Sequence, residues 1–140
     1  MNNNKLWFLK AQDYWNDVSP DVDGMLGGYP ELDDVDLLFS EIFLKKYFES
    51  GSGELALDAG AGIGRISKKL LSRYFKSIIL LESNPVFIQK AVNDLGPICI
   101  HSLCTRLQDV EFDGLWSYSL DLVWIQWVLI YLDDGIIILI

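Results

Sequence analysis

The chain has 140 residues, of which 51% are hydrophobic and 22% charged, a composition that is typical of one globular domain and excludes a disordered or fibrous protein. The formal net charge of −9 argues against nucleic acid as a partner, because a phosphate backbone attracts basic surfaces. Cys99 and Cys104 have only His101 nearby, too few ligands for a zinc site, so we expect reduced thiols and no metal. No apolar run approaches the length of a membrane span and no signal-like segment opens the chain, so we expect an intracellular protein without a membrane partner.

The first 50 residues are predicted to form a helical extension that precedes the core. Residues 6–18 are expected to be an amphipathic helix and residues 19–29 a loop, because three glycines and a proline in that stretch favour turns. A second helix is expected to begin at Asp33 or Asp34, either of which can cap it, and to end near Phe48. Its apolar residues have the three- and four-residue spacing of one buried stripe, formed by Val35, Leu38, Phe39, Ile42 and Phe43.

Residues 51–140 are predicted to form an α/β core, and residues 1–140 together a single domain. Apolar runs predict buried strands at 54–58, 77–81, 98–103, 120–127 and 135–140. Helices are expected at 65–75 and 85–95. Asn84 caps the second of them, with Pro85 at its first position and Gly96 just past its end. This alternation predicts a parallel, doubly wound sheet that binds its ligand beyond the carboxyl ends of the strands.

A glycine loop, Gly60-Ala61-Gly62-Ile63-Gly64, joins the first strand to its helix. Alone, such a loop is equally compatible with a tight turn that binds nothing. Here Asp58 precedes the loop, and Glu82 ends the next strand, eighteen residues after Gly64. A carboxylate at that distance can accept hydrogen bonds from both hydroxyls of a ribose, so we predict a nucleoside ligand.

The same loop resembles motif I of the class I S-adenosylmethionine-dependent methyltransferases. A dinucleotide-binding loop would carry a third glycine where this chain has Arg65, which disfavours a nicotinamide-dependent oxidoreductase. The resemblance places Arg65 where it can pair with the methionyl carboxylate of S-adenosylmethionine. It implies a Rossmann-like class I methyltransferase sheet.

Five segments resemble, more narrowly, the protein α-N-terminal methyltransferases, and they occur in the same order. They are Tyr14-Trp15, residues 22–29 (VDGMLGGY), residues 57–66 (LDAGAGIGRI), Leu107-Gln108-Asp109 and residues 123–128 (VWIQWV). This family methylates the α-amino group of proteins that begin, after methionine removal, with a small residue followed by Pro and Lys. The resemblance implies S-adenosylmethionine as cofactor, protein N-terminal peptides as substrates, and a location in the cytoplasm and nucleus.

The resemblance assigns two groups of residues to the site. The cofactor group is Gly60, Arg65, Glu82, Leu107, Gln108 and Gln126, with Glu82 where an aspartate is usual. The peptide entrance consists of Trp15, Gly27, Gly28 and Trp127. An indole face suits a protonated lysine or a pyrrolidine ring, which is one physical reason for a tryptophan there. No residue is assigned a catalytic role.

Two departures from the family bear on activity. Tyr131 stands where the family has a histidine that helps to orient or deprotonate the amine, and tyrosine, with an ordinary pKa of about 10, is a poor base at neutral pH. The family continues with a helix, further strands and an acidic base, whereas here residues 131–134 lead directly into residues 135–140. The predicted sheet is therefore incomplete at its C-terminal end.

The short connection before residues 135–140 excludes them as a parallel neighbour of the preceding strand. Only about seven residues separate Trp127 from Gly135, whereas a parallel crossover takes about a dozen or more. A hairpin through Asp134-Gly135 and a helical or loose tail both remain open. In each case an apolar sheet edge is left exposed, which favours self-association.

Three functional interpretations are compared. The first is S-adenosylmethionine-dependent methylation of protein N-termini of the Xaa-Pro-Lys type. The second is a catalytically inactive or truncated family member that binds cofactor or peptide without turnover. The third, an oxidoreductase with a Rossmann-type fold, is disfavoured by the arginine at position 65.

Overall fold

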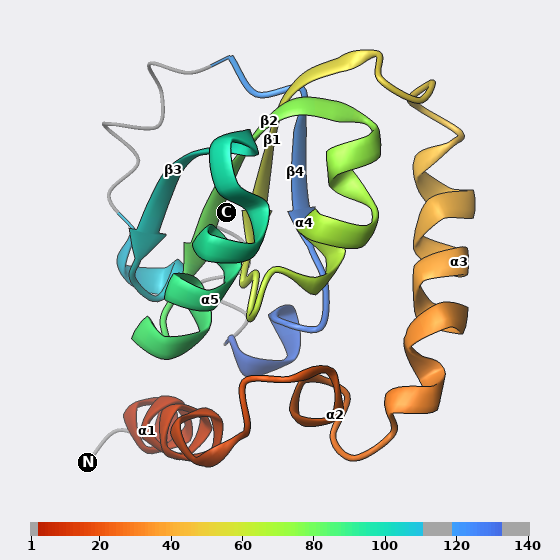
Figure 1. The fold of residues 1–140 in the computed structure, drawn as a ribbon. Helices are drawn as coiled ribbons and strands as arrows, with labels where there is room; N and C mark the ends of the chain where they lie inside the picture. The colour runs from red at the N-terminus through yellow and green to blue at the C-terminus, as the bar shows by residue number, and fades with distance from the viewer. Residues whose placement is uncertain (1–2, 111–118, 133–140) are drawn as a thin grey trace.

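The computed structural model describes residues 3–110 and 119–132, and within them the side chains from residue 9 onward (Figure 1). The N-terminal part contains α1 (Asn3–Asp17), α2 (Val22–Met25), the 3₁₀ turn η1 (Pro30–Leu32) and α3 (Asp33–Leu44). The core adds α4 (Arg65–Lys69), α5 (Pro85–Leu95) and the 3₁₀ turns η2 (Leu71–Arg73), η3 (Gly96–Ile98), η4 (Leu107–Asp109) and η6 (Leu129–Tyr131). Across the described ranges, no helix is long and apolar enough to cross a membrane.

Four parallel strands form the sheet: β1 (Gly53–Ala59), β2 (Phe75–Glu82), β3 (Cys99–Cys104) and β4 (Leu122–Ile125). Their order is β3-β2-β1-β4, so the chain builds outward from β1 to β3 and then returns to the other side of β1. In the register of the sheet, Asp58 of β1 lies opposite Leu80 of β2 and Trp124 of β4. The predicted parallel, doubly wound sheet is confirmed, and the direction of its winding changes at β1.

The sheet has a hydrophobic core on both faces. Successive side chains of a strand point to opposite faces. Ile78 and Leu80 of β2 accordingly belong to one cluster of buried residues, and Ile79 and Leu81 belong to another. All four side chains are 1% exposed or less. Burial on both faces explains why β2 is a continuous apolar run instead of an alternating one.

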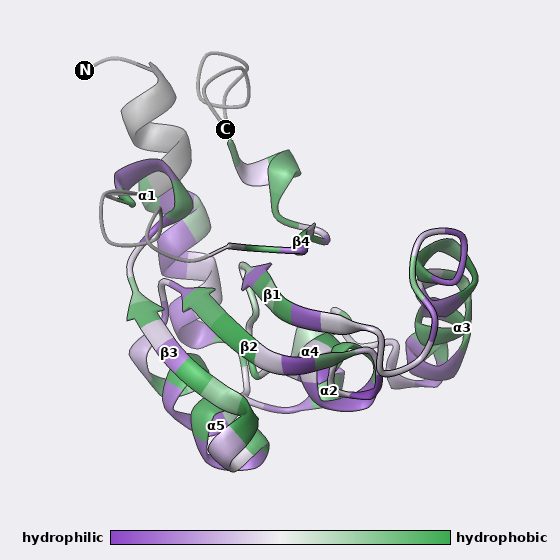
Figure 2. Cartoon of the chain, turned by 90° about the horizontal axis from the view of Figure 1, so that it is seen from above, coloured by the Kyte–Doolittle hydropathy of each residue, from purple (hydrophilic) through white to green (hydrophobic). Residues whose placement is uncertain are grey.

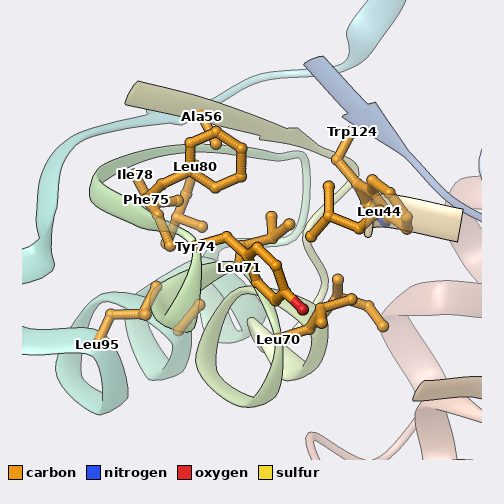
Figure 3. Packing of buried hydrophobic residues seen from close by; sticks show 12 residues of the cluster. Leu44, Ala56, Leu70, Leu71, Tyr74, Phe75, Ile78, Leu80, Leu95 and Trp124 are labelled. Atoms are coloured by element: carbon orange, nitrogen blue, oxygen red, sulfur yellow. The ribbon is translucent and has the colours of Figure 1, made fainter. Parts of the chain in front are cut away.

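The larger cluster lies under α4 and α5, which cover the same face of the sheet (Figure 2). Leu71 and Tyr74, from the turn after α4, belong to it together with Leu95 of α5 (Figure 3). Leu44 of α3 and Trp124 of β4 lie together at the other end of the same cluster. This packing fixes the start of α4 and the end of β4, both of which carry predicted site residues.

α5 begins and ends as predicted. Asn84 Oδ1 accepts hydrogen bonds from the N–H groups of Val86 at 2.9 Å and Phe87 at 3.2 Å. Pro85 occupies the first helical position, where no intrahelical N–H bond is lost. Gly96 follows the last helical residue with a φ of +58°, a conformation that favours glycine.

The helix predicted over residues 65–75 is wrong in its second half. α4 ends at Lys69, η2 follows, and β2 already begins at Phe75. Leu70 and Leu71 are completely buried in this arrangement, so core packing overrides the local preference for helix. The loop predicted over residues 19–29 likewise contains α2, whose N-cap Asp21 accepts a hydrogen bond from a backbone N–H at 2.8 Å.

The strand predicted over residues 120–127 is shorter than expected, because β4 ends at Ile125. Trp127 has a φ of +61°, and this left-handed conformation is incompatible with an extended strand. Residues 135–140, predicted as a fifth strand, lie outside the described residues.

The stripe predicted to be buried on α3 is exposed. Each of its five residues is between 49% and 66% exposed: Val35, Leu38, Phe39, Ile42 and Phe43. α3 stands beside α4 at the side of the molecule (Figure 1) and contacts the core through Leu44, which is buried, and Leu37, which is partly buried. The polar side of the helix fixes its rotation, because Asp33 forms a buried ion pair with Arg65 of α4. This ion pair turns the apolar stripe outward.

Candidate functional site

A cavity opens at the carboxyl ends of the central strands, where the winding of the sheet changes direction. Eight of the predicted site residues line it, namely Trp15, Gly60, Arg65, Glu82, Leu107, Gln108, Gln126 and Trp127. They come from α1, the glycine loop, the start of α4, the end of β2, η4 and the segment after β4. The sheet thus brings together residues from both ends of the described chain.

The predicted pair Gly27 and Gly28 is not part of the cavity lining. Both have a positive φ, +62° and +90°, and a Cβ on either would meet no atom within 4 Å. Their loop reaches the cavity through Met25 instead, whose Sδ lies 2.8 Å from where a Cβ on Gly62 would be. The two glycines turn the chain, and Met25, which was not predicted as a site residue, borders the site.

The loop between β1 and α4 requires glycine because other segments pass close to it. Its three glycines have φ angles between +56° and +79°. A Cβ on Gly60 would lie 2.1 Å from Val128 Cγ2, and one on Gly64 would lie 2.8 Å from Ala91 Cβ. The Gly60 N–H donates to the carbonyl of Leu81 at 2.7 Å, which ties the loop to β2. The loop therefore presents backbone to the cavity.

Glu82 is held in place by hydrogen bonds from its own neighbourhood. Its Oε2 accepts from the Gly62 N–H at 2.9 Å, and its Oε1 accepts from the Asn84 N–H at 2.7 Å and from Ser83 Oγ at 3.2 Å. A carboxylate has about four acceptor positions, so three are used. Glu82 keeps room for one ribose hydroxyl, and a second would have to displace the Ser83 hydroxyl.

Asp58, at the end of β1, is a second buried carboxylate in the cavity wall. Burial raises the pKa of Asp58 from 3.8 to about 6, although a hydrogen bond from Ser67 Oγ at 2.7 Å opposes the shift. The nearby charge of Glu82 raises the pKa of Asp58 further. Asp58 therefore gains a proton more readily in the folded chain than an aspartate exposed to water does.

Arg65 is held by two carboxylates of α3. Its Nη1 donates to Asp33 Oδ1 at 2.7 Å, its Nη2 donates to Asp36, and Lys69 also donates to Asp33. Burial alone would raise the pKa of Asp33, but hydrogen bonds from Lys69 and Arg65 hold it below its ordinary value. The predicted cap at Asp33 or Asp34 is wrong, since Leu32 is the N-cap of α3 and no side chain caps the helix. That Arg65 also pairs with a ligand carboxylate stays a prediction.

Gln126 and Trp127, after β4, also reach α3. Gln126 Nε2 donates to Asp36 Oδ1 at 2.9 Å, and Trp127 Nε1 donates to the same oxygen at 3.4 Å. Asp36 was not predicted as a site residue. Its only signal in the sequence is a carboxylate near the start of a helix, a pattern that is equally typical of a solvated helix face.

An aromatic cluster around Trp15 lines part of the cavity. The Trp15 ring packs edge to face against Tyr14, Phe87 and Tyr131, with centroid distances of 5.2, 6.4 and 5.8 Å. The carbonyl of Trp15 accepts a hydrogen bond from Asn84 Nδ2 at 3.2 Å, which anchors α1 to the start of α5. Burial raises the pKa of Tyr131 above its ordinary value, so its hydroxyl stays protonated at neutral pH.

Comparison with known proteins identifies the family of the chain. Residues 3–139 match the family described as AdoMet-dependent proline di-methyltransferase. The chain belongs to this family. The fold and the glycine loop of this proline di-methyltransferase family member thus confirm the predicted Rossmann-like class I methyltransferase sheet and leave the oxidoreductase interpretation without support.

Two relatives of this chain have names that refer to Xaa-Pro-Lys N-termini. N-terminal Xaa-Pro-Lys N-methyltransferase 1 of Danio rerio is 39% identical over 135 residues, which are 91% of this chain and 59% of that protein. The Homo sapiens protein of the same name is 36% identical over 137 residues, which are 93% of this chain and 60% of that protein. The proline di-methyltransferase family member therefore spans about 60% of the length of these relatives.

Solved structures agree with the fold. A SAM-dependent methyltransferase from Leishmania major superposes on this chain with a TM-score of 0.79 at 33% identity. The superposition covers 93% of this chain and 52% of the Leishmania protein. Phosphoethanolamine N-methyltransferase 1 from Haemonchus contortus has a TM-score of 0.75 at 22% identity, over 96% of this chain and 28% of that one. The second likeness concerns the fold alone.

Proposed function

We propose that the chain binds S-adenosylmethionine in the cavity and transfers its methyl group to the α-amino group of protein N-termini of the Xaa-Pro-Lys type. The observation that carries the proposal is one cavity, at the switch point of the sheet, that joins Glu82 and Arg65 to Trp15 and Trp127. Membership of an AdoMet-dependent family, and relatives named for Xaa-Pro-Lys N-termini, support it.

The cavity offers different polar groups at its two ends. Glu82 ends β2 and Gln126 follows β4, with β1 between these strands. On the β2 side, the carboxylate of Glu82 suits a ribose hydroxyl. On the β4 side, Arg65 keeps guanidinium N–H groups beyond the two that bond the aspartates, and these suit a carboxylate. This set of donors and acceptors fits a nucleoside joined to an amino acid.

The aromatic side chains fit the peptide part of the proposal. Trp15, near the start of the described chain, and Trp127, near its end, both line the cavity, and Tyr131 lies against Trp15. An indole face binds a pyrrolidine ring by apolar contact and attracts a lysine ammonium through its π electrons. The formal net charge of −9 further favours a cationic N-terminus.

S-adenosylmethionine, when bound, supplies a methyl group that its sulfonium has already activated. The residues of the chain have to orient the amine and exclude water from it. The amine must also be neutral, and an α-amino pKa of about 7.7–8.0 leaves a useful neutral fraction near pH 8. Tyr131 can hydrogen-bond the amine, but burial raises the pKa of Tyr131 and makes it a poor proton acceptor. We therefore assign Tyr131 to orientation.

The second candidate function is binding of cofactor or peptide without turnover. Tyr131 favours it, because the described part of the cavity wall has no histidine beside Trp15 and the raised pKa of Tyr131 leaves no base there. The two candidates share the cofactor site and differ only in methyl transfer.

Two measurements on the 140-residue chain separate these candidates. The first is calorimetric titration with S-adenosylhomocysteine. The second is mass spectrometry of an Xaa-Pro-Lys peptide after incubation with S-adenosylmethionine, with the same peptide acetylated at its α-amino group as the control. Methylation of the free peptide alone supports the enzyme. Binding without methylation supports the second candidate, and a folded chain that neither binds S-adenosylhomocysteine nor methylates the peptide contradicts the cofactor site that both candidates share.

We also propose that copies of this chain associate through β4 and α3. In the described part of the chain, β4 pairs only with β1, and Val123 is 48% exposed on it. The outward stripe of α3 is a second apolar surface. A second copy suits it by charge, since the exposed Asp34 lies in the first turn of α3 and Lys45 and Lys46 follow its last residue. Antiparallel pairing would place each acidic end beside a basic end.

A further inference from the structure

We infer that Asp36 is a positioning residue for the β4 end of the proposed cofactor site, an inference that rests on the proposed function. Asp36 lies on α3 and is not part of the cavity lining. Its carboxylate nevertheless contacts three residues that do line the cavity, Arg65, Gln126 and Trp127. Its side chain is only 16% exposed, so water competes weakly for these contacts.

Asp36 holds the nitrogen end of the Gln126 amide. Gln126 Nε2 donates to Asp36 Oδ1 at 2.9 Å and to Oδ2 at 3.0 Å. On its other side, Gln126 Oε1 accepts from Trp124 Nε1 at 2.9 Å and from Ser40 Oγ at 3.3 Å. Both oxygens of the Asp36 carboxylate therefore lie within hydrogen-bond distance of the amide nitrogen. Without Asp36 the nitrogen loses its acceptor, and only the donors to Oε1 hold the amide.

Asp36 also links Arg65 to Gln126. Arg65 is buried and bonds both Asp33 and Asp36. Asp33 also pairs with Lys69, so it can attach α3 to α4 without the help of Asp36. Asp36, in contrast, joins the guanidinium of Arg65 to the amide of Gln126. The two polar groups at this end of the cavity therefore share one acceptor and are oriented together.

The contact with Trp127 extends the same arrangement to the proposed peptide entrance. Trp127 has a φ of +61°, which is strained for a bulky residue and persists only where surrounding groups hold it. Its side chain is 66% exposed, so packing contributes little to holding it. Its Nε1 donates to Asp36 Oδ1 at 3.4 Å, a long hydrogen bond that places the indole beside Gln126. Asp36 thus connects the cofactor end of the cavity to the entrance.

Two ligands distinguish positioning from general structural support. S-adenosylhomocysteine carries an amino-acid group, whereas 5′-methylthioadenosine keeps the nucleoside and the thioether and lacks that group. For Asp36→Asn we expect the Kd of S-adenosylhomocysteine to rise about tenfold or more. One of the two oxygens that bond Arg65 and Gln126 becomes an NH₂ group, so one hydrogen bond to a charged group is lost. The Kd of 5′-methylthioadenosine should stay within about threefold, since Glu82 at the other end is untouched.

Asp34→Asn is the matched control, because it makes the same charge change on the same helical turn at an exposed position. It should leave both dissociation constants unchanged. Equal losses of both ligands in Asp36→Asn would overturn the inference, since they would indicate structural support only. Tighter binding of S-adenosylhomocysteine would overturn it as well, because Asp36 would then compete with the ligand for Arg65.

A second variant covers the case in which Asp36→Asn does not fold. Gln126→Leu removes the amide that Asp36 orients, and it should produce the same selective loss of S-adenosylhomocysteine. An unchanged affinity for this ligand would overturn the inference. A wild-type chain that binds neither ligand would instead contradict the proposed function itself, and the role of Asp36 with it. Binding of 5′-methylthioadenosine by the wild type therefore separates the two failures.

Discussion

Trp15 of α1 and Tyr131 of η6 pack edge to face in the wall of the cavity, with their ring centroids 5.8 Å apart and their planes at 81°. The two residues come from opposite ends of the described chain, so the pair joins α1 to the segment after β4. Phe87 of α5 contacts the same indole at 6.4 Å. Tyr131 therefore lines the cavity beside Trp15, a residue of the proposed peptide entrance.

Tyr131→His is expected to increase methyl transfer at pH 7 by at least about tenfold, because it supplies a general base with a pKa of about 6.5. Burial raises the pKa of Tyr131 above its ordinary value, so the wild-type residue cannot accept a proton at this pH. Initial rates with an Xaa-Pro-Lys peptide between pH 6 and 9 measure the effect. Tyr131→Phe, which keeps the ring, is the control. Equal pH profiles for the histidine variant and the wild type would rule out a base at this position.

Glu82→Ala is expected to weaken S-adenosylhomocysteine binding by about 100-fold, because the ligand loses an acceptor and the Gly62 and Asn84 N–H groups lose theirs. Calorimetric titration measures the change. Glu54→Ala is the matched control, since Glu54 is exposed and pairs only with Lys76 at the start of β2 in the described structure. An unchanged dissociation constant in Glu82→Ala would place the nucleoside elsewhere.

Features that depend on local backbone chemistry were predictable from the sequence. The cap at Asn84 and the glycine at Gly96 locate both ends of α5, because each acts within one helical turn. The glycines of the loop after β1 identify a backbone that needs a positive φ. Glu82 was predictable because the length of a βαβ unit determines where the second strand ends.

Features that depend on distant partners were not predictable from the sequence. The rotation of α3 follows from ion pairs that Asp33 and Asp36 form with Arg65, across about thirty residues of chain. Helical periodicity identifies an apolar stripe but does not say which neighbour covers it. Gly27 and Gly28 were likewise placed by resemblance, whereas the fold brings Met25 of the same segment to the cavity.

Asp58 should make stability depend on pH. Burial raises the pKa of Asp58 from 3.8 to about 6, so between these values the folded chain holds a proton that the unfolded chain has released. The free energy of unfolding therefore falls as pH rises through this window. Asp58→Asn keeps an acceptor for Ser67 and removes the titration. The free energy of unfolding of the variant minus that of the wild type should increase by roughly 2–3 kcal/mol as the pH rises from 4 to 7.

Urea denaturation of both proteins at pH 4, 5, 6 and 7 measures this difference. The pKa of Asp33 is lowered against the effect of burial by hydrogen bonds from Lys69 and Arg65, and backbone hydrogen bonds lower the pKa of Asp121. Both carboxylates stabilise the fold above pH 4 and lose that effect as pH falls through their folded pKa values. They are common to both proteins and cancel in the difference. A difference that does not vary with pH would mean that Asp58 titrates as in an unfolded chain.

Phe39→Glu is expected to abolish association between copies. Phe39 is 66% exposed on the outward stripe of α3, and burying one such ring stabilises an interface by roughly 1.5–3 kcal/mol. A glutamate there loses this contribution and places a charge in the interface, so the dissociation constant should rise by more than about tenfold. Sedimentation velocity over a concentration series measures the change. Ile100→Glu, on the opposite edge strand β3 at 47% exposure, is the control. Loss of association in Ile100→Glu alone would assign the contact to β3 instead of α3 and β4.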